Sequence, residues 1–291
     1  MNKLLLFITM SISTCTVHLF AQAPKTDAII LKGTISDKAD QPLAYVSVGI
    51  LNKPVGTVSD SLGNFSFEIS NGNLSDTLQV SIVGYNSFQI LVKDFISGPE
   101  KKIRLTERAT QLEEVVVTSG KERKNTEIIG RQGSGKLTQV SIHHKTSVEE
   151  TIGSEMGMRY RIEKNNAILK DLNFYISANN FNSIKFRINI YSVKNDLPDT
   201  LIYNKQIFTT LDKYKTGWTK IDLEDYNIKI KDDIIVTAQW IESSLNKTER
   251  PVTMVPVAMS LFSKNCYVRV ASQDKWKKVG MKLSNFITIA Y

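Results

Sequence analysis

Apolar and polar residues alternate in short runs between residues 28 and 105. Gly, Asp, Asn and Pro interrupt these runs about every ten residues, which is typical of turns between short strands. Successive side chains on a strand point to opposite faces, so each run predicts a strand with one buried face. The pattern predicts an all-β sandwich. Its expected core positions include Val46, Val48, Phe65, Phe67, Leu78 and Val80.

The alternation returns at about residue 148 and continues to the C-terminus. Within 184–190, four apolar residues share one phase and polar residues fill the other, which predicts a long strand with one buried face. Trp240 shares the phase of Val236 and Ala238 and is therefore expected in the core. The succession of strands is similar in rhythm to jelly-roll sandwiches of the carbohydrate-binding-module type. We therefore expect a second, jelly-roll-like β-sandwich over residues 148–291.

Four motifs in the first region agree in order and spacing with a known domain. They are Gly33–Asp37 (GTISD), Pro42–Val48 (PLAYVSV), Gly56–Phe65 (GTVSDSLGNF) and Val83–Tyr85 (VGY). Together they resemble the carboxypeptidase-regulatory-like domain, and the resemblance covers residues 28–107. It implies a transthyretin-like sandwich of seven strands with no catalytic role, of the kind found in exported proteins of the Bacteroidota.

Residues 108–147 are polar and contain several glycines, which predicts a linker between the two sandwiches. This linker includes the segment Glu114, Val115, Val116, Val117 and Thr118. In outer-membrane receptors with the same first domain, a similar stretch contacts the energy-transducing protein TonB. No plug domain follows here, and 291 residues cannot supply the roughly 22 strands of a large transporter barrel. The segment is instead a candidate for adding a strand to a partner's sheet.

The first 23 residues predict a secretory signal peptide. Lys3 supplies the positive charge, an apolar stretch follows, and Ala21–Ala23 has the small residues of a cleavage site. Cys15 leaves lipidation as an open alternative. After removal of the signal, Cys266 would be the only cysteine, and no later segment is apolar enough to span a bilayer. We therefore expect an exported protein, periplasmic or associated with the outer membrane.

Composition and motifs argue against catalysis and against nucleic-acid binding. The net charge is +8, but Lys and Arg are scattered among Asp and Glu, which favours a solvated surface. His143 and His144 are adjacent and lack the spacing of a zinc peptidase. A serine hydrolase would need a Gly-x-Ser-x-Gly turn, which is absent from the sequence. We expect no enzyme activity, no metal site and no cofactor.

Six residues are candidates for contact with a ligand or a partner. Tyr175, Arg187, Asn189 and Tyr191 fall on the polar phase of their predicted strands, and Trp218 and Trp276 lie in or near loops. Exposed aromatic and polar side chains suit either a protein contact or a glycan. The favoured function is a non-catalytic interaction or scaffold protein of the cell envelope, whose partner is an envelope protein or a glycan. Carbohydrate binding by the second sandwich and a TonB-linked accessory role are the alternatives.

Overall fold

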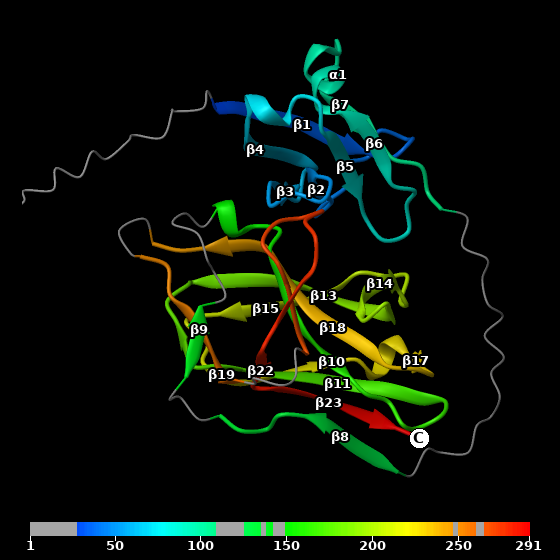
Figure 1. The fold of residues 1–291 in the computed structure, drawn as a ribbon, viewed down its shortest axis with the longest axis vertical. Helices are drawn as coiled ribbons and strands as arrows, with labels where there is room; N and C mark the ends of the chain where they lie inside the picture. Colours follow the sequence, from blue (N-terminus) through cyan, green and yellow to red (C-terminus); the bar gives the residue numbers. More distant parts are fainter. Residues whose placement is uncertain (1–27, 109–124, 135–137, 142–148, 247–249, 260–264) are drawn as a thin grey trace, which may run out of the picture.

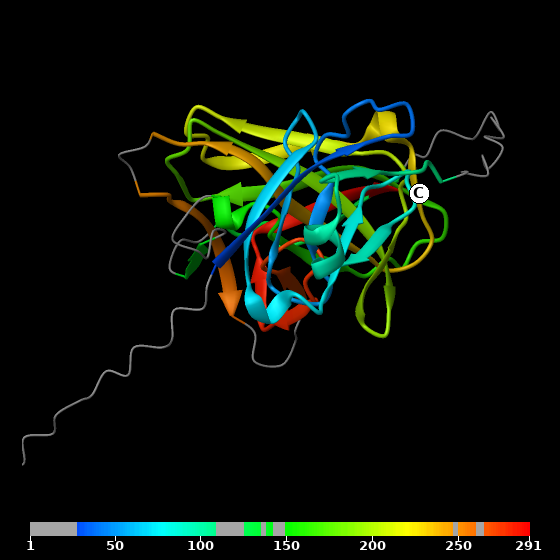
Figure 2. The same ribbon diagram turned by 90° about the horizontal axis from the view of Figure 1, so that it is seen from above.

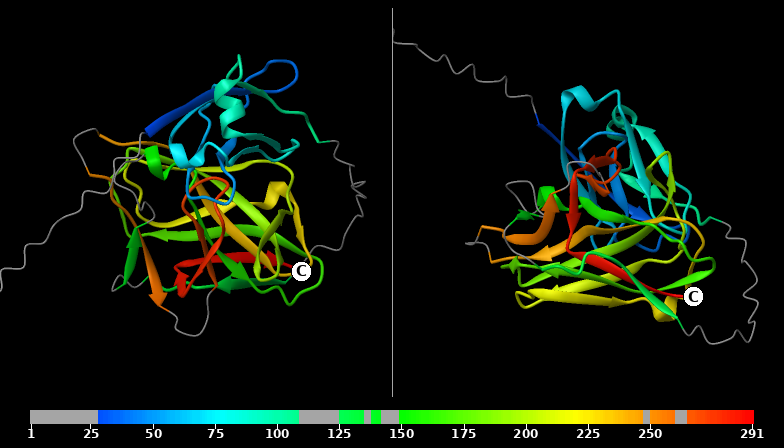
Figure 3. Two further views of the ribbon diagram at one scale, coloured as in Figure 1. Left: turned by 45° about the horizontal axis from the view of Figure 1, so that its top comes forward. Right: turned by 60° about the horizontal axis from the view of Figure 1, so that its bottom comes forward.

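The structure is a computed structural model, and it describes residues 28–108, 125–134, 138–141, 149–246, 250–259 and 265–291. The predicted signal peptide, Cys15, the two central histidines and Glu114–Thr118 lie outside these ranges. An N-terminal domain packs against one side of a larger second domain, and the C-terminus lies toward the opposite side (Figures 1 and 3). Within the described ranges, no helix is long and apolar enough to cross a membrane.

The N-terminal domain, residues 28–108, is a sandwich of seven strands. Its elements are β1 (Ala28–Ser36), β2 (Ser47–Ile50), β3 (Gly56–Val58), β4 (Asn64–Ser70), β5 (Thr77–Ser81), β6 (Phe88–Leu91), α1 (Val92–Ser97), β7 (Lys102–Arg104) and the 3-10 helix Asn71–Asn73. One sheet has the order β4-β1-β7 and the other β3-β2-β5-β6. Alternate side chains of both sheets meet in a single apolar core, so the predicted seven-stranded sandwich is confirmed.

The second domain, from residue 125 to the C-terminus, also consists of β-sheets. Among the described residues, a seven-stranded sheet contains β10 (Glu155–Tyr160), β13 (Ser183–Lys194), β14 (Leu197–Leu201), β15 (Ile207–Asp212), β18 (Ile234–Ser244), β20 (Cys266–Arg269) and β21 (Lys277–Val279). A five-stranded sheet contains β8 (Thr126–Gly130), β11 (Ala167–Ile176), β16 (Gly217–Asp222), β17 (Ile228–Ile230) and β23 (Asn285–Ala290). A four-stranded sheet contains β9 (Gln139–Ser141), β12 (Ala178–Asn179), β19 (Thr253–Met259) and β22 (Met281–Leu283). Short 3-10 helices span Glu149–Thr151 and Glu224–Tyr226. The all-β fold class is confirmed.

The structure differs from the predicted linker at residues 108–147. Strand β8 pairs with the C-terminal strand β23, and β9 pairs with β19, so both belong to the second domain. The two strands are short and lie beside glycine-containing polar sequence, and Ile128 is exposed. The alternation of apolar and polar residues is weak in β8 and β9, so the sequence does not predict them. Backbone pairing to β23 and β19 holds the two strands in place.

The two faces of the seven-stranded sheet have opposite character. One phase of β10, β13, β18 and β20 enters the main core, where Trp240 is buried as its phase predicts. Cys266 is also buried there, and burial raises the pKa of its thiol to about 12. The other phase is polar, and the N-terminal domain lies over it (Figure 2). A face that looks solvent-exposed in the sequence is therefore an interface between domains.

Candidate functional site between the two domains

A row of buried and partly buried polar side chains crosses four adjacent strands of the seven-stranded sheet. Arg187 on β13 is in register with Gln239 on β18, Gln239 with Glu155 on β10, and Glu155 with Arg269 on β20. Side chains at directly opposed positions on neighbouring strands touch each other. We call Arg187, Gln239, Glu155 and Arg269 the polar row. It alternates cation, amide, carboxylate and cation on the face that the N-terminal domain covers.

Glu155 has no exposed side-chain surface and is held by charged and polar partners. Arg269 donates to its carboxylate from Nε at 2.8 Å and also from Nη2. Asn189 donates at 2.8 Å, the Tyr191 hydroxyl at 3.2 Å, and Thr237 also donates. Burial alone would raise the pKa of Glu155, but Arg269 and these hydrogen bonds outweigh it and hold that pKa below its ordinary value.

Arg187 joins the two domains. Its Nη1 donates to the backbone carbonyl of Tyr45 at 2.7 Å, and its Nη2 donates to the Ser47 hydroxyl at 2.7 Å. The same guanidinium also donates to the amide oxygens of Gln239 and Gln206. All of these acceptors are neutral, so no carboxylate of the described residues is in hydrogen-bond contact with the buried charge. Burial consequently lowers the pKa of Arg187.

A second polar contact lies beside Arg187. Gln273 donates to the Ser81 hydroxyl at 2.7 Å and to the backbone carbonyl of Ser47 at 3.3 Å. It accepts from Gln79 at 2.7 Å, and its backbone carbonyl accepts from the backbone N–H of Asn52 at 2.8 Å. These bonds use the outward phase of β2 and β5, whose other phase builds the N-terminal core. The sheet β3-β2-β5-β6 therefore forms the N-terminal side of the interface.

Gly49 sets how closely the two domains approach. A Cβ at this position would lie 2.2 Å from the carbonyl oxygen of Ser272 in the second domain. The carbonyl oxygen belongs to the backbone and the position of a Cβ is fixed by its own backbone, so no rotamer change relieves the clash. We expect Gly49→Ala to separate the domains locally and to destabilise the chain by about 1–3 kcal/mol, the usual cost of overpacking. Thermal unfolding and limited proteolysis check this. Gly72→Ala is the matched control, because the nearest atom to its Cβ is 3.6 Å away. Equal behaviour of the two variants would contradict the prediction.

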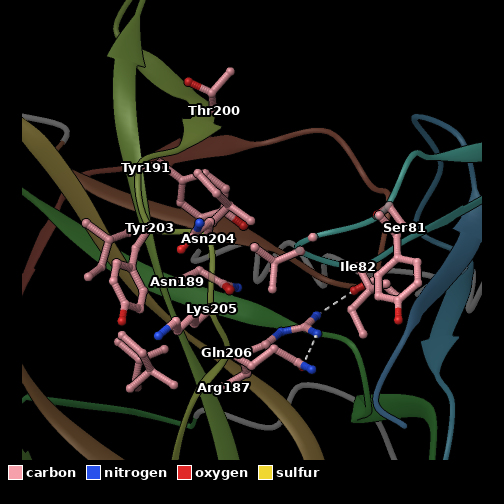
Figure 4. A pocket seen from close by; sticks show the side chains of 18 of the residues that line it. Ser81, Ile82, Arg187, Asn189, Tyr191, Thr200, Tyr203, Asn204, Lys205 and Gln206 are labelled. Carbon is pink, nitrogen blue, oxygen red and sulfur yellow. Dashed lines mark hydrogen bonds between the residues drawn. The ribbon is translucent and has the colours of Figure 1, made fainter. Parts of the chain in front are cut away.

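A cavity of about 420 Å³ opens beside the polar row, between the domains (Figure 4). Ser81, Ile82 and Tyr85 line it from the N-terminal domain, and Arg187–Tyr191 and residues 199–201 and 203–207 line it from the second domain. In Figure 4, Arg187, Asn189 and Gln206 lie opposite Ser81 and Ile82. Its volume falls within the range of roughly 300–1,000 Å³ found for small-molecule sites, which favour domain interfaces. This interdomain cavity is the candidate functional site.

The N-terminal half of this site matches a known family. Residues 31–117 match the model of the CarboxypepD_reg-like domain. The N-terminal domain is a CarboxypepD_reg-like domain. The match extends past the boundary expected at residue 107. It therefore includes Glu114–Val117 of the EVVVT segment, although that segment lies outside the described residues.

Comparison of the whole chain with solved structures gives only remote likenesses. One is to the cysteine protease and lectin-like domains of Cwp84, a surface layer associated protein of Clostridium difficile, with 9% identity and a TM-score of 0.40. It covers 84% of this chain and 58% of that chain, so this chain spans less than two thirds of that structure. Another is to the clostridial cysteine protease Cwp84 after propeptide cleavage, with 9% identity, a TM-score of 0.40, and coverage of 91% and 70%. At this identity and TM-score, neither likeness indicates a function for this chain. No curated protein matches the sequence.

The structure brings together four of the six candidate residues. Arg187, Asn189 and Tyr191 line the cavity against the CarboxypepD_reg-like domain. Trp276 packs edge-on against Tyr191 with ring centroids 5.7 Å apart, and the Arg269 guanidinium lies 4.7 Å from the Trp276 ring. Trp276 is thus half-buried against Tyr191 and Arg269, two residues that line the cavity.

Tyr175 and Trp218 lie elsewhere. They face each other across β11 and β16 of the five-stranded sheet, with ring centroids 5.4 Å apart. Trp218 also packs against Phe286, at 5.0 Å. Both side chains are half-buried in this aromatic cluster, away from the CarboxypepD_reg-like domain. The six candidate residues therefore do not share one surface: Tyr175 and Trp218 belong to the five-stranded sheet, whereas the other four lie on or beside the seven-stranded sheet.

Sequence reasoning missed four polar or charged residues of the site. Glu155 and Arg269 pair with each other in the polar row, and Gln239 and Gln273 hydrogen-bond to residues of the CarboxypepD_reg-like domain. None of the four was a candidate. A signal exists for the first three, since each occupies the polar phase of a strand. Gln273 lies in a turn with a positive φ of 68°, and no periodicity points to it. Among the described residues, no group of three or more His, Cys, Asp or Glu side chains could hold a metal ion.

Proposed function

We propose that this chain is a non-catalytic interaction or scaffold protein of the cell envelope, in which the two domains act as one rigid binding unit. One observation carries the proposal: the CarboxypepD_reg-like domain is fixed on the second domain by buried hydrogen bonds that still leave an open cavity between them. A buried polar interface specifies one relative orientation, because each group must meet its own partner. Such an interface suits a preorganised binding site.

The chemistry of the polar row supports a binding role over a catalytic one. The Glu155 carboxylate accepts hydrogen bonds from four different side chains, so it has little capacity left to exchange a proton with a substrate. The Arg187 guanidinium donates its hydrogen bonds to neutral acceptors in both domains. Groups that are fully engaged in this way maintain architecture. A general acid or base needs a proton within reach of a reacting group.

Carbohydrate binding is the second candidate, and the lining of the cavity favours it. Tyr85 and Tyr203 supply aromatic surface, and Asn204, Gln206 and Thr200 supply amide and hydroxyl groups beside it. Aromatic faces next to polar groups fit the alternating apolar and hydroxyl surfaces of a sugar. The TonB-linked alternative depends on Glu114–Thr118 and stays a prediction.

Crosslinking in living cells tests the proposal with the full chain. A photo-crosslinking residue at Asn204, in the cavity wall, is expected to capture an envelope protein or glycan. The same residue at Lys229, on β17 of the five-stranded sheet, is the matched control and is expected to capture little. Cell fractionation should place the protein in the envelope, with residues 1–23 removed. A cytosolic, unprocessed chain, or equal capture at both positions, would contradict the proposed function.

A further inference from the structure

We propose that the interdomain cavity binds an acidic saccharide through its carboxylate, with Lys205 as the residue that selects the charge. This inference rests on the proposed function, because it specifies the ligand class of the same site. Three features lead to it: the surplus of positive charge in the cavity wall, the way in which Arg187 is hydrogen-bonded, and the mixture of aromatic and amide groups at the cavity mouth.

The wall of the cavity carries more positive than negative side chains. Among its described residues, Arg187, Lys205 and Arg269 are cations and Asp199 is a carboxylate, whereas Arg108 also lines the wall but interacts with other groups of the protein. The Glu155 carboxylate forms an ion pair with Arg269 and balances its charge. A cleft that is lined by one sign of charge and walled by protein concentrates the field and attracts the opposite charge. The cavity is therefore suited to an anion.

Arg187 contributes to this field without being the direct ligand contact. Its Nε, Nη1 and Nη2 atoms all donate to acceptors of the protein, and these acceptors are neutral. Arg187 is only 6% exposed, so solvent screens its charge poorly. A buried cation without a contacting carboxylate favours an anion placed nearby. The anion must take its hydrogen bonds from other donors.

Lys205 is placed to supply them. It lies in the segment between β14 and β15, lines the cavity and is exposed. Figure 4 shows it beside Tyr203 and Gln206 on the wall that also carries Arg187 and Asn189. Within the described part of the chain, Lys205 forms no ion pair. A lysine ammonium has three donors on a flexible stem and can reach a carboxylate that enters the cavity.

The neutral groups around Lys205 favour a saccharide as the carrier of that carboxylate. Tyr203 and Tyr85 are half-buried, and both line the cavity. Asn204 and Gln206 flank Lys205 and offer amide donors and acceptors to ring hydroxyls. The cavity volume of about 420 Å³ is sufficient for a small ligand rather than a folded partner. A uronic acid at the end of an oligosaccharide has both the charge and the hydroxyls.

Calorimetric titration of the full mature chain tests this proposal. The probes are digalacturonate and its neutral counterpart galactobiose, each at low and at high salt. We expect binding of the acidic disaccharide that weakens with salt, because exposed charges are screened, and at least tenfold weaker binding of the neutral one. Lys205→Gln should reduce affinity for digalacturonate by about tenfold, the size of one charge-assisted hydrogen bond. Lys229→Gln, an exposed lysine outside the cavity, should leave it unchanged.

Each other outcome overturns the inference in a recognisable way. Equal affinity for the two disaccharides would show a sugar site without charge selection. Tighter binding of an acidic peptide of equal charge would assign the cavity to proteins. Absence of binding by either disaccharide would remove the saccharide altogether. None of these results decides the proposed function, which the crosslinking at Asn204 tests independently.

Discussion

Replacing Glu155 by glutamine should lower the free energy of unfolding by about 3–5 kcal/mol at neutral pH, because removing one partner leaves a buried opposite charge uncompensated. Arg269 would lose its carboxylate, and the field that favours a charged Arg187 would disappear with it. Asn189 and Thr237 would then face an amide that can itself donate, in place of a carboxylate that only accepts. Chemical denaturation of wild type and variant measures the difference.

The pH dependence of this difference identifies its electrostatic origin. The pKa of Glu155 lies below its ordinary value of 4.5 in the folded chain. A carboxyl group of this kind contributes stability above its unfolded pKa, and the contribution is lost as the pH falls through the folded pKa. The gap between wild type and Glu155→Gln should therefore be widest near neutral pH and should narrow below about pH 4.5.

A surface carboxylate provides the control. Glu224 pairs with Lys170, but its side chain is 52% exposed, and exposed ion pairs contribute little to stability. Glu224→Gln should unfold like the wild type at every pH. A gap for Glu155→Gln that stays constant from pH 7 to pH 3 would show that the loss comes from packing rather than from charge.

Sequence periodicity predicts the strands of this chain well, because burial of one face of a strand requires an apolar residue at every second position. Ile184, Phe186 and Ile188 lie in the core as expected, and Arg187 and Asn189 point to the opposite side. Alternation assigns a side chain to a face, but it does not say what covers that face. The polar phase of β13 therefore indicates a contact surface and gives no sign that the chain's own N-terminal domain occupies part of it.

Position within a sheet explains the remaining differences. Tyr175 and Arg187 both occupy the polar phase of a strand, yet they lie on the outer faces of two different sheets. Only the strand pairing shows which sheet each residue belongs to. Pairing between distant segments such as β8 and β23 leaves little trace in a short polar sequence. Arg187 and the Ser47 hydroxyl meet across 140 residues of sequence, a separation that no local pattern encodes.

Arg187→Met should destabilise the chain by about 3 kcal/mol and loosen the CarboxypepD_reg-like domain from the second domain. The substitution leaves the Tyr45 carbonyl, the Ser47 hydroxyl and the Gln239 amide without their donor, and a buried unpaired polar group costs roughly 1–3 kcal/mol. Removal of a desolvated charge offsets part of that sum. Denaturant unfolding gives the stability, and limited proteolysis with small-angle scattering reports the relative positions of the domains.

Arg104→Met is the matched control, because that arginine lies on the N-terminal surface, where its ion pairs with Asp40 and Glu100 are exposed to water. Its loss should change neither the unfolding curve nor the scattering profile. The comparison separates the loss of an interdomain contact from the loss of any cation. If Arg187→Met kept the wild-type scattering profile and protease resistance, the buried guanidinium would not be what holds the domains together, and the cavity would need another support.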